Sequence, residues 1–289
     1  IMRLGWDCFL AKTDIKSAFR LLPVHPDDHH LLGLKFQGAF YYDRMLAMGL
    51  GVSCQIFEKF SSALQWIAQS KLGVQNMLHI LDDFLIIAPT QAACAAQLKA
   101  FQDMCADVGV PLAPDKTEGP AQVLTFAGIQ LDTQQLEARL PEEKVAHFGK
   151  HAVEIGRRRK CTLRELQSVI GGVNHCCCVI PGGRAFLRRL IDLTKGLNKP
   201  HFKTRLNNAV RADLAIWVTF LAEFNGRAFM LPNEWLASDI LQLYTDASTT
   251  VGFGALLGKR WFAGLWPEPC KTLNIAVLEL YPIVIAAIV

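Results

Sequence analysis

The stretch HILDDFLIIAP, residues 79–89, constrains the fold of this chain more than any other. It places two adjacent carboxylates, Asp82 and Asp83, between apolar runs with the composition of buried β-strands. Such a pair is compatible with an ordinary hairpin turn, because Asp tolerates turn geometry and needs water. Adjacent carboxylates repel each other, however, and a divalent cation with oxygen ligands commonly neutralises them. The metal interpretation requires a third carboxylate from elsewhere in the chain.

Asp14, in AKTDIKSAF, is the candidate for this third carboxylate. It follows the short apolar stretch Cys8–Ala11 and is followed by a polar turn at 15–17. If this strand lies beside the hairpin, Asp14 joins Asp82 and Asp83 at one edge of a sheet. Three carboxylates around one point would form a site for Mg²⁺.

Residues 1–140 mix short apolar strands with longer helices, which indicates an α+β fold with strands in one layer and helices in the other. We expect strand pairs around Gln37-Gly38, around Asp82-Asp83 and within 122–140. Helices are expected at 53–69, with Ser53 as the N-cap, and at about 91–108.

Beyond Pro141 the strand pattern disappears. Helices are expected at about 142–156, 162–178, 182–194 and 206–224. Thr162 and Glu165 have the spacing of a capping box at the start of the second of these. After residue 232 strands return in LQLYTDAS, GFGALLG and RWFAGLW, followed by a helix near Asn274. We therefore expect three units, at 1–140, 141–232 and 233–289.

The apolar tail IVIAAIV raises the question of a membrane anchor. The run that contains it is interrupted by Glu279 and Pro282 and is shorter than the roughly 20 residues that a spanning helix needs. We therefore expect a buried helix and no membrane partner.

Charge is distributed unevenly along the chain. Residues 141–211 hold fifteen Lys or Arg against five Asp or Glu, a net charge of +10, and the remainder of the chain carries −6. A basic region beside an acidic one fits a polyanion-binding protein with a metal-carboxylate centre. A solvated helical face is the other interpretation of the same charges.

The nine cysteines form no CxxC pair, and neighbours in the run at 176–178 would point in different directions on a helix. An odd cysteine count without a signal peptide indicates a reducing, intracellular setting, cytoplasmic or nuclear.

Several motifs, taken in order, resemble reverse transcriptase motifs A to E in sequence and spacing: TDIKSAF, LAMGLGVSCQIF, ILDDFLI, LAPDKTE and LTFAGIQLD. The later motifs TLRELQSVIGG, PGGRAFLRRLIDL, LYTDAS and LELYPIVIAA resemble the connecting region and RNase H of retrotransposons, most closely DIRS-like elements, which also encode a tyrosine recombinase. The resemblance implies a palm with remnant fingers at 1–140, a helical thumb and connection at 141–232, and the truncated N-terminal part of an RNase H-like domain at 233–289.

The resemblance implies RNA-directed DNA polymerase activity by two-metal phosphoryl transfer. Asp14 and Asp82 would bridge two Mg²⁺ ions, with Mn²⁺ as an alternative, and Asp83 would complete the cluster. The backbone of Ile15 would cradle the triphosphate. Phe19 stands where the family places a ring that excludes a 2′-hydroxyl; a core phenylalanine is the interpretation that applies if Asp14 is not catalytic.

Other positions have a counterpart in the family. Gly49 and Ser53 match the turn and helix start of motif B, although Ala47 and Cys54 stand where prolines are common. Lys116 matches a motif D lysine that donates a proton to pyrophosphate, and is equally compatible with an ordinary surface lysine. Phe126, Gly128 and Ile129 lie in the segment that resembles the primer grip.

The basic region would hold duplex phosphates through charge without reading sequence. The side chains expected to do so are Arg157, Arg158, Arg159, Lys160, Arg184, Arg188 and Arg189. In the RNase H-like segment the matching carboxylates are Asp246 and Glu279. Because that active site needs carboxylates from further downstream, no RNA cleavage is expected, and with only thirteen residues before Asp14 we expect weak polymerisation.

The implied partners are an RNA or DNA template-primer duplex, dNTPs and the remainder of a polyprotein. An RNA-dependent RNA polymerase shares the palm, but Phe19 and the RNase H-like segment argue against it. The intact aspartate triad argues against a decayed or domesticated copy that binds nucleic acid without catalysis, whereas Ala47, Cys54 and the missing ends leave this alternative open. A metabolic enzyme would leave the basic region without a purpose.

Overall fold

The computed structural model describes residues 1, 3–224, 228–229 and 237–288. The chain divides into two compact units, residues 1–231 and 232–289. The first unit holds both the mixed α/β region and the helical region expected from the sequence. The expected border near residue 140 therefore lies inside one compact unit.

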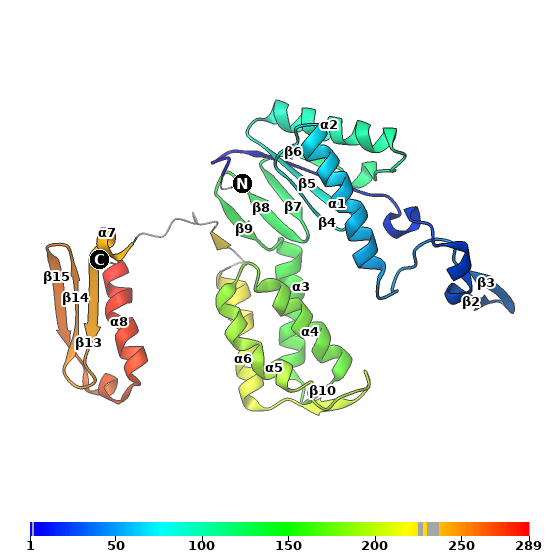
Figure 1. The fold of residues 1–289 in the computed structure, drawn as a ribbon. Coiled ribbons are helices and arrows are strands. Elements are labelled where there is room, and N and C mark those ends of the chain that lie inside the picture. Colours follow the sequence, from blue (N-terminus) through cyan, green and yellow to red (C-terminus); the bar gives the residue numbers. More distant parts are fainter. Residues whose placement is uncertain (2, 225–227, 230–236, 289) are drawn as a thin grey trace. The chain divides into compact units, whose positions relative to one another are not determined.

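A four-stranded antiparallel sheet in the order β4-β5-β1-β6 forms the centre of the α/β region (Figure 1). Its strands are β1 (Phe9–Asp14), β4 (Met77–Ile80), β5 (Asp83–Ala88) and β6 (Glu118–Ala121). Strand β5 is buried on both faces, with Phe84 and Ile86 in one core and Leu85 and Ile87 in another. Successive side chains of a strand point to opposite faces, which explains the unbroken apolar run of β5.

Helices α1 (Ser53–Lys71) and α2 (Gln91–Asp107) pack on one face of this sheet (Figure 1). The core between them contains Phe57, Phe84 and Phe101, each fully buried, and the rings of the last two lie 4.9 Å apart. Both helices occur where the apolar spacing predicts them, and the mixture of helices with antiparallel sheets confirms that part of the expected fold class.

The opposite face of the sheet is covered by a meander of β7 (Val123–Phe126), β8 (Ile129–Asp132) and β9 (Glu137–Arg139). A short strand β12 (Ala228–Phe229) pairs with β9 and extends this second sheet. The segment 122–140 therefore forms three strands where the sequence predicts a simple hairpin.

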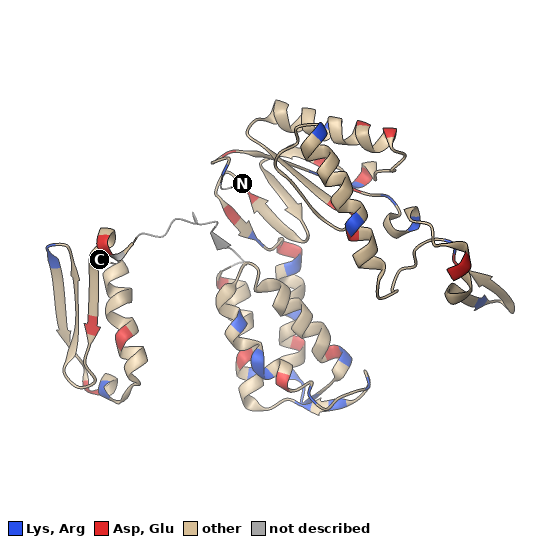
Figure 2. Ribbon diagram, viewed as in Figure 1, with Lys and Arg blue, Asp and Glu red and all other residues tan. Residues whose placement is uncertain are grey.

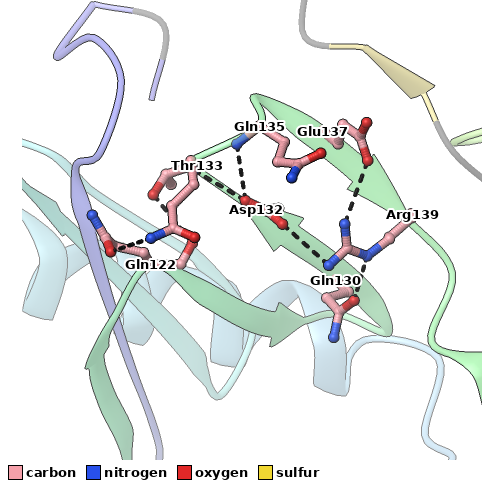
Figure 3. Close-up of polar contacts among 8 residues, drawn as sticks. Gln122, Gln130, Asp132, Thr133, Gln135, Glu137 and Arg139 are labelled. Atoms are coloured by element: carbon pink, nitrogen blue, oxygen red, sulfur yellow. Dashed lines mark hydrogen bonds and ion pairs between the residues drawn. The ribbon is translucent and has the colours of Figure 1, made fainter.

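The partly buried guanidinium of Arg139 holds the meander in register (Figure 3). Asp132 and Glu137 are both buried, and the Arg139 Nη2 and Nη1 atoms lie 3.1 Å and 3.4 Å from their carboxylates. The Nε of Arg139 donates to Gln130 at 2.6 Å. Asp132 also accepts two backbone N–H bonds from the following turn. Buried charges persist only when paired in this way, so the network ties β8 to β9.

Before α1 the chain forms a two-stranded ribbon of β2 (Gly33–Phe36) and β3 (Ala39–Tyr42), preceded by the 3₁₀ turns η1 (Ala18–Leu21) and η2 (Pro26–Leu32). Gln37 and Gly38 form its turn with φ of 49° and 83°. The hairpin expected around these two residues is confirmed.

The helical region contains α3 (Glu142–Arg157), α4 (Leu163–Cys176), α5 (Arg188–Asp192) and α6 (Asn208–Glu223). The capping box of Thr162 and Glu165 is present. The single helix expected at 182–194 is wrong, because this segment forms the 3₁₀ turn η4 (Pro181–Phe186) and the short α5. The expected absence of strands is also wrong. Strands β10 (Lys160–Thr162) and β11 (Lys203–Arg205) pair with each other, and three residues are too few to show a period.

Trp217 of α6 lies at the centre of this region, fully buried. It packs directly against Gly183, where an added Cβ would lie 2.2 Å from the ring carbon Cη2. The neighbouring Gly182 has nothing within 4 Å of such an atom. The second glycine of the PGG motif is therefore required by close packing.

The second unit contains an antiparallel sheet of β13 (Leu243–Ala247), β14 (Gly252–Leu257) and β15 (Arg260–Leu265), with the short α7 (Ser238–Leu241), the 3₁₀ turn η5 (Glu268–Thr272) and α8 (Ile275–Ile288). The three strands and the last helix occur where predicted.

The expectation of a buried tail is wrong. Only Leu278 and Pro282 of α8 are buried, whereas Leu280 is 56% and Ile288 is 76% exposed. The tail is largely exposed because the three-stranded sheet of the second unit covers only one side of α8. Among the residues that the structure describes, no helix is long and apolar enough to cross a bilayer.

Candidate active site

The first and fifth strands bring the expected carboxylates together. In the antiparallel pair of β1 and β5, Asp14 lies directly opposite Asp83. Opposed residues of such a pair point to the same face. Asp82 occupies the turn immediately before β5, and its carbonyl accepts a hydrogen bond from the backbone N–H of Ile15 at 3.0 Å. Segments far apart in the sequence thus place all three acidic residues at one end of the sheet.

The turn that carries Asp82 is strained. Ile80 pairs with Asp83, so Leu81 and Asp82 form a two-residue hairpin connection. Leu81 has φ of 53°, in the left-handed region that a bulky residue rarely adopts. Strain of this kind is retained where the surrounding structure holds it and is concentrated at functional sites. The conformation of the turn fixes the backbone position of Asp82.

The carboxylates perturb one another. Burial raises the pKa of Asp83, and its hydrogen bond with Asp14 and repulsion by the charges of Asp14 and Asp82 raise it further. The ammonium of Lys116, on the 3₁₀ turn η3 (Pro114–Lys116), lies 2.9 Å from Oδ2 of the buried Asp14. The hydrogen bond to Asp14 raises the pKa of Lys116. The site concentrates negative charge that one lysine offsets in part.

The donor set fits a hard cation in part. Asp14 and Asp83 lie opposite each other and offer carboxylate oxygens, which are the ligands that Mg²⁺ and Mn²⁺ prefer. Within the described ranges, no three Asp, Glu, His or Cys side chains are grouped so as to hold a metal ion. The arrangement therefore provides two facing carboxylates with Asp82 as an electrostatic neighbour.

Phe19 and two residues of the motif B segment, Leu46 and Phe57, belong to the core that also contains Ile15, the residue after Asp14. Phe19 is partly buried and contacts the Phe57 ring edge-on at 5.1 Å, a position compatible with either role considered for it. Gly49 has φ of 84°, as a turn glycine requires. The expectation that Ser53 caps α1 is wrong. Its side chain donates to the carbonyl of Ala47 at 2.6 Å, which closes the preceding turn, and Val52 is the N-cap.

The turn between β7 and β8, in the segment expected to be the primer grip, is held by the helical region. Its residues Ala127 and Gly128 have φ of 48° and 78°. A Cβ on Gly128 would lie 2.0 Å from Nζ of Lys144, and Nε2 of His175 lies 3.3 Å from the Gly128 carbonyl. Phe126 belongs to the core under the sheet, whereas Ile129 packs against the helical core.

Residues 2–131 match the family model described as reverse transcriptase (RNA-dependent DNA polymerase). This segment is a reverse transcriptase domain. All three clustered acidic residues lie inside it.

Curated relatives are retroviral and hepadnaviral. The chain is 25% identical to the Gag-Pro-Pol polyprotein of squirrel monkey retrovirus over 210 residues, which is 70% of this chain and 10% of that polyprotein. It is 28% identical over 120 residues to Protein P of duck hepatitis B virus, 41% of this chain and 14% of that protein. The chain thus spans only a small part of the length of these relatives.

Two solved structures share the fold. They are the foamy viral protease-reverse transcriptase in complex with double-stranded DNA, at a TM-score of 0.58 and 15% identity, and with an RNA/DNA hybrid, at 0.58 and 16%. Each covers 97% of this chain, and this chain covers 47% and 36% of those chains. At such identity the likeness shows the fold alone.

His79, next to the acidic turn of the reverse transcriptase domain, is a residue that the sequence analysis does not predict to be part of the site. His79 of β4 has a side chain only 8% exposed, and its ring stacks on Phe84 at 5.4 Å. Its two nitrogens lie 2.5 Å from the Gln65 side-chain oxygen and 3.1 Å from Glu58, both on α1. His79 therefore joins α1 to the hairpin that carries Asp82. Its nearness to the LDD motif is the one sequence signal that points to it.

All seven basic side chains expected to bind nucleic acid are exposed. Figure 2 shows Lys and Arg residues gathered at the end of the helical region that carries β10. Three of the seven also form ion pairs: Arg189 with the buried Asp213 at 2.7 Å, Arg188 with Asp192 at 3.3 Å, and Arg158 with Glu165 at 2.6 Å. The structure thus gives Arg189 a role in the fold, which its sequence position does not reveal.

In the second unit, Asp246 lies on β13 and Glu279 on α8, and both are exposed. Helix α8 packs against β13. Within the described residues no hydrogen bond or ion pair joins the two carboxylates.

Proposed function

We propose that this chain provides the active site of an RNA-directed DNA polymerase that extends a primer with dNTPs on an RNA or DNA template. The observation that carries the proposal is the pairing of Asp14 with Asp83 across β1 and β5, with Asp82 in the adjoining strained turn. Phosphoryl transfer requires positioning and neutralisation of charge more than covalent chemistry. A cluster of acidic side chains at a sheet end is suited to that task.

Asp14 and Asp83, with Asp82 beside them, would hold the divalent cations. Bound Mg²⁺ lowers the pKa of the primer 3′-hydroxyl and stabilises the leaving pyrophosphate. The carboxylates orient the site, and the backbone of Ile15 would face the triphosphate. The ammonium of Lys116 donates a hydrogen bond to Asp14, and this bond raises the pKa of Lys116. To donate a proton to pyrophosphate, Lys116 would have to break the bond to Asp14 and form one to the phosphate.

Selectivity for dNTPs is assigned to Phe19, whose ring is supported by Phe57 and would meet a 2′-hydroxyl. Gly49 and Ser53 would shape the surface under the nascent base pair, since the bond from Ser53 to Ala47 fixes this turn. Gly128 and its neighbours would hold the primer end.

We further assign the chain to a retrotransposon, with DIRS-like elements as the nearest group, on the motifs at 162–172 and 181–193. The retroviral relatives are named polyproteins, so the remainder of such a polyprotein is the proposed partner. Asp246 and Glu279 would be RNase H carboxylates.

The proposal is tested by Mg²⁺-dependent dNTP incorporation on a primed RNA template. Asp82→Asn and Asp83→Asn should each lower the rate about a hundredfold or more, because each removes charge that stabilises the transition state. Asp107→Asn, which neutralises an exposed carboxylate at the end of α2, is the matched control and should leave the rate unchanged. Equal rates in all four proteins would refute the proposal.

A second candidate is binding of nucleic acid without catalysis. The ion pair of Lys116 with Asp14 favours it, because the lysine neutralises a carboxylate that a cation would need. The same assay distinguishes the two, since the second candidate gives template-primer binding and no incorporation by the unmodified chain.

The RNase H assignment has a separate test. The second unit supplies two carboxylates that match RNase H, Asp246 and Glu279. The described residues contain no group of three His, Cys, Asp or Glu side chains that could hold a metal ion. We expect no cleavage of the RNA strand of an RNA-DNA hybrid by this chain. Efficient cleavage that Asp246→Asn abolishes would contradict this expectation.

A further inference from the structure

His79 of β4 is a polar residue at a position that an apolar side chain could fill. It stands opposite Phe84 in the pairing of β4 with β5, and Phe84 belongs to the core that the sheet shares with α1 and α2. The His79 side chain is only 8% exposed, and its ring stacks on that of Phe84 at 5.4 Å. Burial of a polar ring costs free energy unless its nitrogens find partners. The role of His79 therefore depends on what those partners are.

Both ring nitrogens of His79 meet side chains of α1. Nε2 lies 3.1 Å from a carboxylate oxygen of Glu58 and donates to it, since a carboxylate only accepts. Nδ1 lies 2.5 Å from the side-chain oxygen of Gln65. Glu58 and Gln65 are seven residues apart and therefore lie two turns apart on one face of the helix. We call His79, Glu58 and Gln65 the brace.

The brace and the acidic cluster lie on opposite faces of the hairpin. Successive side chains of a strand alternate between the two faces of a sheet. His79 and Phe84 point toward the helices, so the next pair along, Ile80 and Asp83, points to the other face. His79 therefore acts on the carboxylates through the backbone of the hairpin. The path is short, because only Ile80 separates His79 from the turn that carries Asp82.

The same turn is tied on its other side to β1. The backbone N–H of Ile15 donates to the carbonyl of Asp82 at 3.0 Å. Between this tie and the brace, Leu81 has φ of 53°, a strained conformation that persists where the surrounding structure holds it. Loss of either tie would let the turn relax. The brace is thus one of two contacts that fix the backbone of the acidic turn.

Helix α1 also supports the other half of the proposed site. Its first residue, Ser53, closes the motif B turn by its bond to Ala47. The ring of Phe57 contacts that of Phe19 edge-on at 5.1 Å, and Glu58 follows directly in the sequence. Two consecutive residues of one helix therefore contact the proposed sugar gate and the histidine of the acidic hairpin.

We propose that His79 is a positioning residue for nucleotide incorporation. It sets the hairpin of Asp82 and Asp83 at a fixed position relative to α1, and so relative to Phe19, which would meet the sugar of the incoming nucleotide. The inference rests on the proposed function and deepens it. A misplacement of about 1 Å in an active site can lower a rate about a hundredfold, so a residue that touches neither substrate nor cation can determine the rate.

The first test separates the hydrogen bonds of His79 from its packing. His79→Phe keeps a ring to stack on Phe84 and removes both bonds to α1. The fold should be retained, because Glu58 is exposed and Gln65 is half-buried, so water reaches both former partners. With Mg²⁺, dNTPs and a primed RNA template, kcat should fall about 10- to 100-fold. The KM for dNTP and the affinity for template-primer should stay within about twofold, as for an interaction that matters only in the transition state.

Variants of Glu58 provide the matched comparison. Glu58→Ala removes one bond of the brace, whereas Glu58→Gln keeps an oxygen that accepts the same bond. Glu58→Ala should therefore be slow, and Glu58→Gln should recover most of the rate. Adding Glu58→Ala to His79→Phe should lower the rate no further, because both changes break one brace. Ser62→Ala, which shortens an exposed side chain of α1 between Glu58 and Gln65, is the control and should leave the rate unchanged.

The second test needs neither metal nor substrate. Amide hydrogen exchange of the full 289-residue chain in EDTA, followed by mass spectrometry, reports local opening of the hairpin. His79→Phe should speed exchange several-fold in residues 77–84 and leave α2 unchanged. Ser62→Ala should change neither segment.

The inference is overturned if His79→Phe incorporates dNTPs at the rate of Ser62→Ala, or if its loss lies in KM or in template-primer affinity. A Glu58→Gln variant as slow as Glu58→Ala would also overturn it, as would unchanged exchange in residues 77–84. If Asp82→Asn abolishes incorporation and His79→Phe does not affect it, the proposed function stands and this inference alone fails. If the unmodified chain incorporates nothing, the proposed function fails, and the exchange measurement still decides whether His79 holds the hairpin.

Discussion

The contact between Gly183 and Trp217 gives a sharp prediction for stability. In Gly183→Ala the new methyl carbon would lie 2.2, 2.5 and 2.9 Å from three ring carbons of Trp217, whereas ordinary contacts begin at 3.4 Å. The ring would have to move by about 1.2 Å, the difference between the first and last of these distances. Because Trp217 is fully buried in a packed core, the space for such a movement must come from its neighbours.

Overpacking of this kind costs typically 1–3 kcal/mol, and we expect about 3 kcal/mol here because the obstacle is a rigid ring. Urea denaturation followed by circular dichroism should show a lower midpoint with an unchanged slope. Thermal unfolding should occur roughly 6–12 °C lower, given about 2–4 °C per kcal/mol for a unit of this size.

Gly182→Ala is the matched control. It introduces the same methyl group one residue earlier, where nothing lies within 4 Å. Both variants reduce the freedom of the unfolded chain equally, so their difference isolates the contact with Trp217. Equal stability of the two variants would refute the packing argument.

Three further outcomes follow from the charges. Asp83→Asn should raise the melting temperature at neutral pH, because the pKa of Asp83 is raised in the folded protein and its charged form therefore lowers stability above that pKa. The gain should shrink as the pH falls through the raised pKa toward 3.8, the ordinary value for Asp. A lower melting temperature of the variant at pH 7 would contradict this prediction. Lys116→Met should strengthen Mn²⁺ binding several-fold, measured by electron paramagnetic resonance, because Asp14 loses its competing cation; weaker binding would oppose this. Arg139→Met should lower the free energy of unfolding by about 3–5 kcal/mol in urea denaturation, because the buried Asp132 loses its only cationic partner among the described residues, and adding Asp132→Asn should recover part of the loss.

Local features could be predicted from the sequence because they depend on neighbouring residues. The turn at Gln37-Gly38 and the capping box of Thr162 are set by residue types a few positions apart. The proximity of Asp14 to Asp83 does not follow from neighbouring residues alone. The family resemblance and the requirement for a shared cation predict it, and the register of β1 and β5 places the two residues opposite each other.

The remaining features depend on contacts between particular residues or segments in the folded chain. The periodicity of apolar residues along the sequence carries no information about such contacts. Strands β10 and β11 are three residues each and pair across an intervening pair of helices. Arg189 resembles its basic neighbours until the buried Asp213 is placed beside it. Ser53 has the residue type and position of a cap, but the carbonyl of Ala47 lies within its reach and takes the hydroxyl proton.

The meander of β7, β8 and β9 belongs to two hydrophobic cores at once. Phe126 packs beneath the central sheet, and three residues later Ile129 packs among the helices, while His175 contacts the intervening turn. A tilt of the helices would therefore displace the turn that we propose to hold the primer. Under the proposed function, movement of the duplex and placement of the primer terminus would be coupled through these few residues.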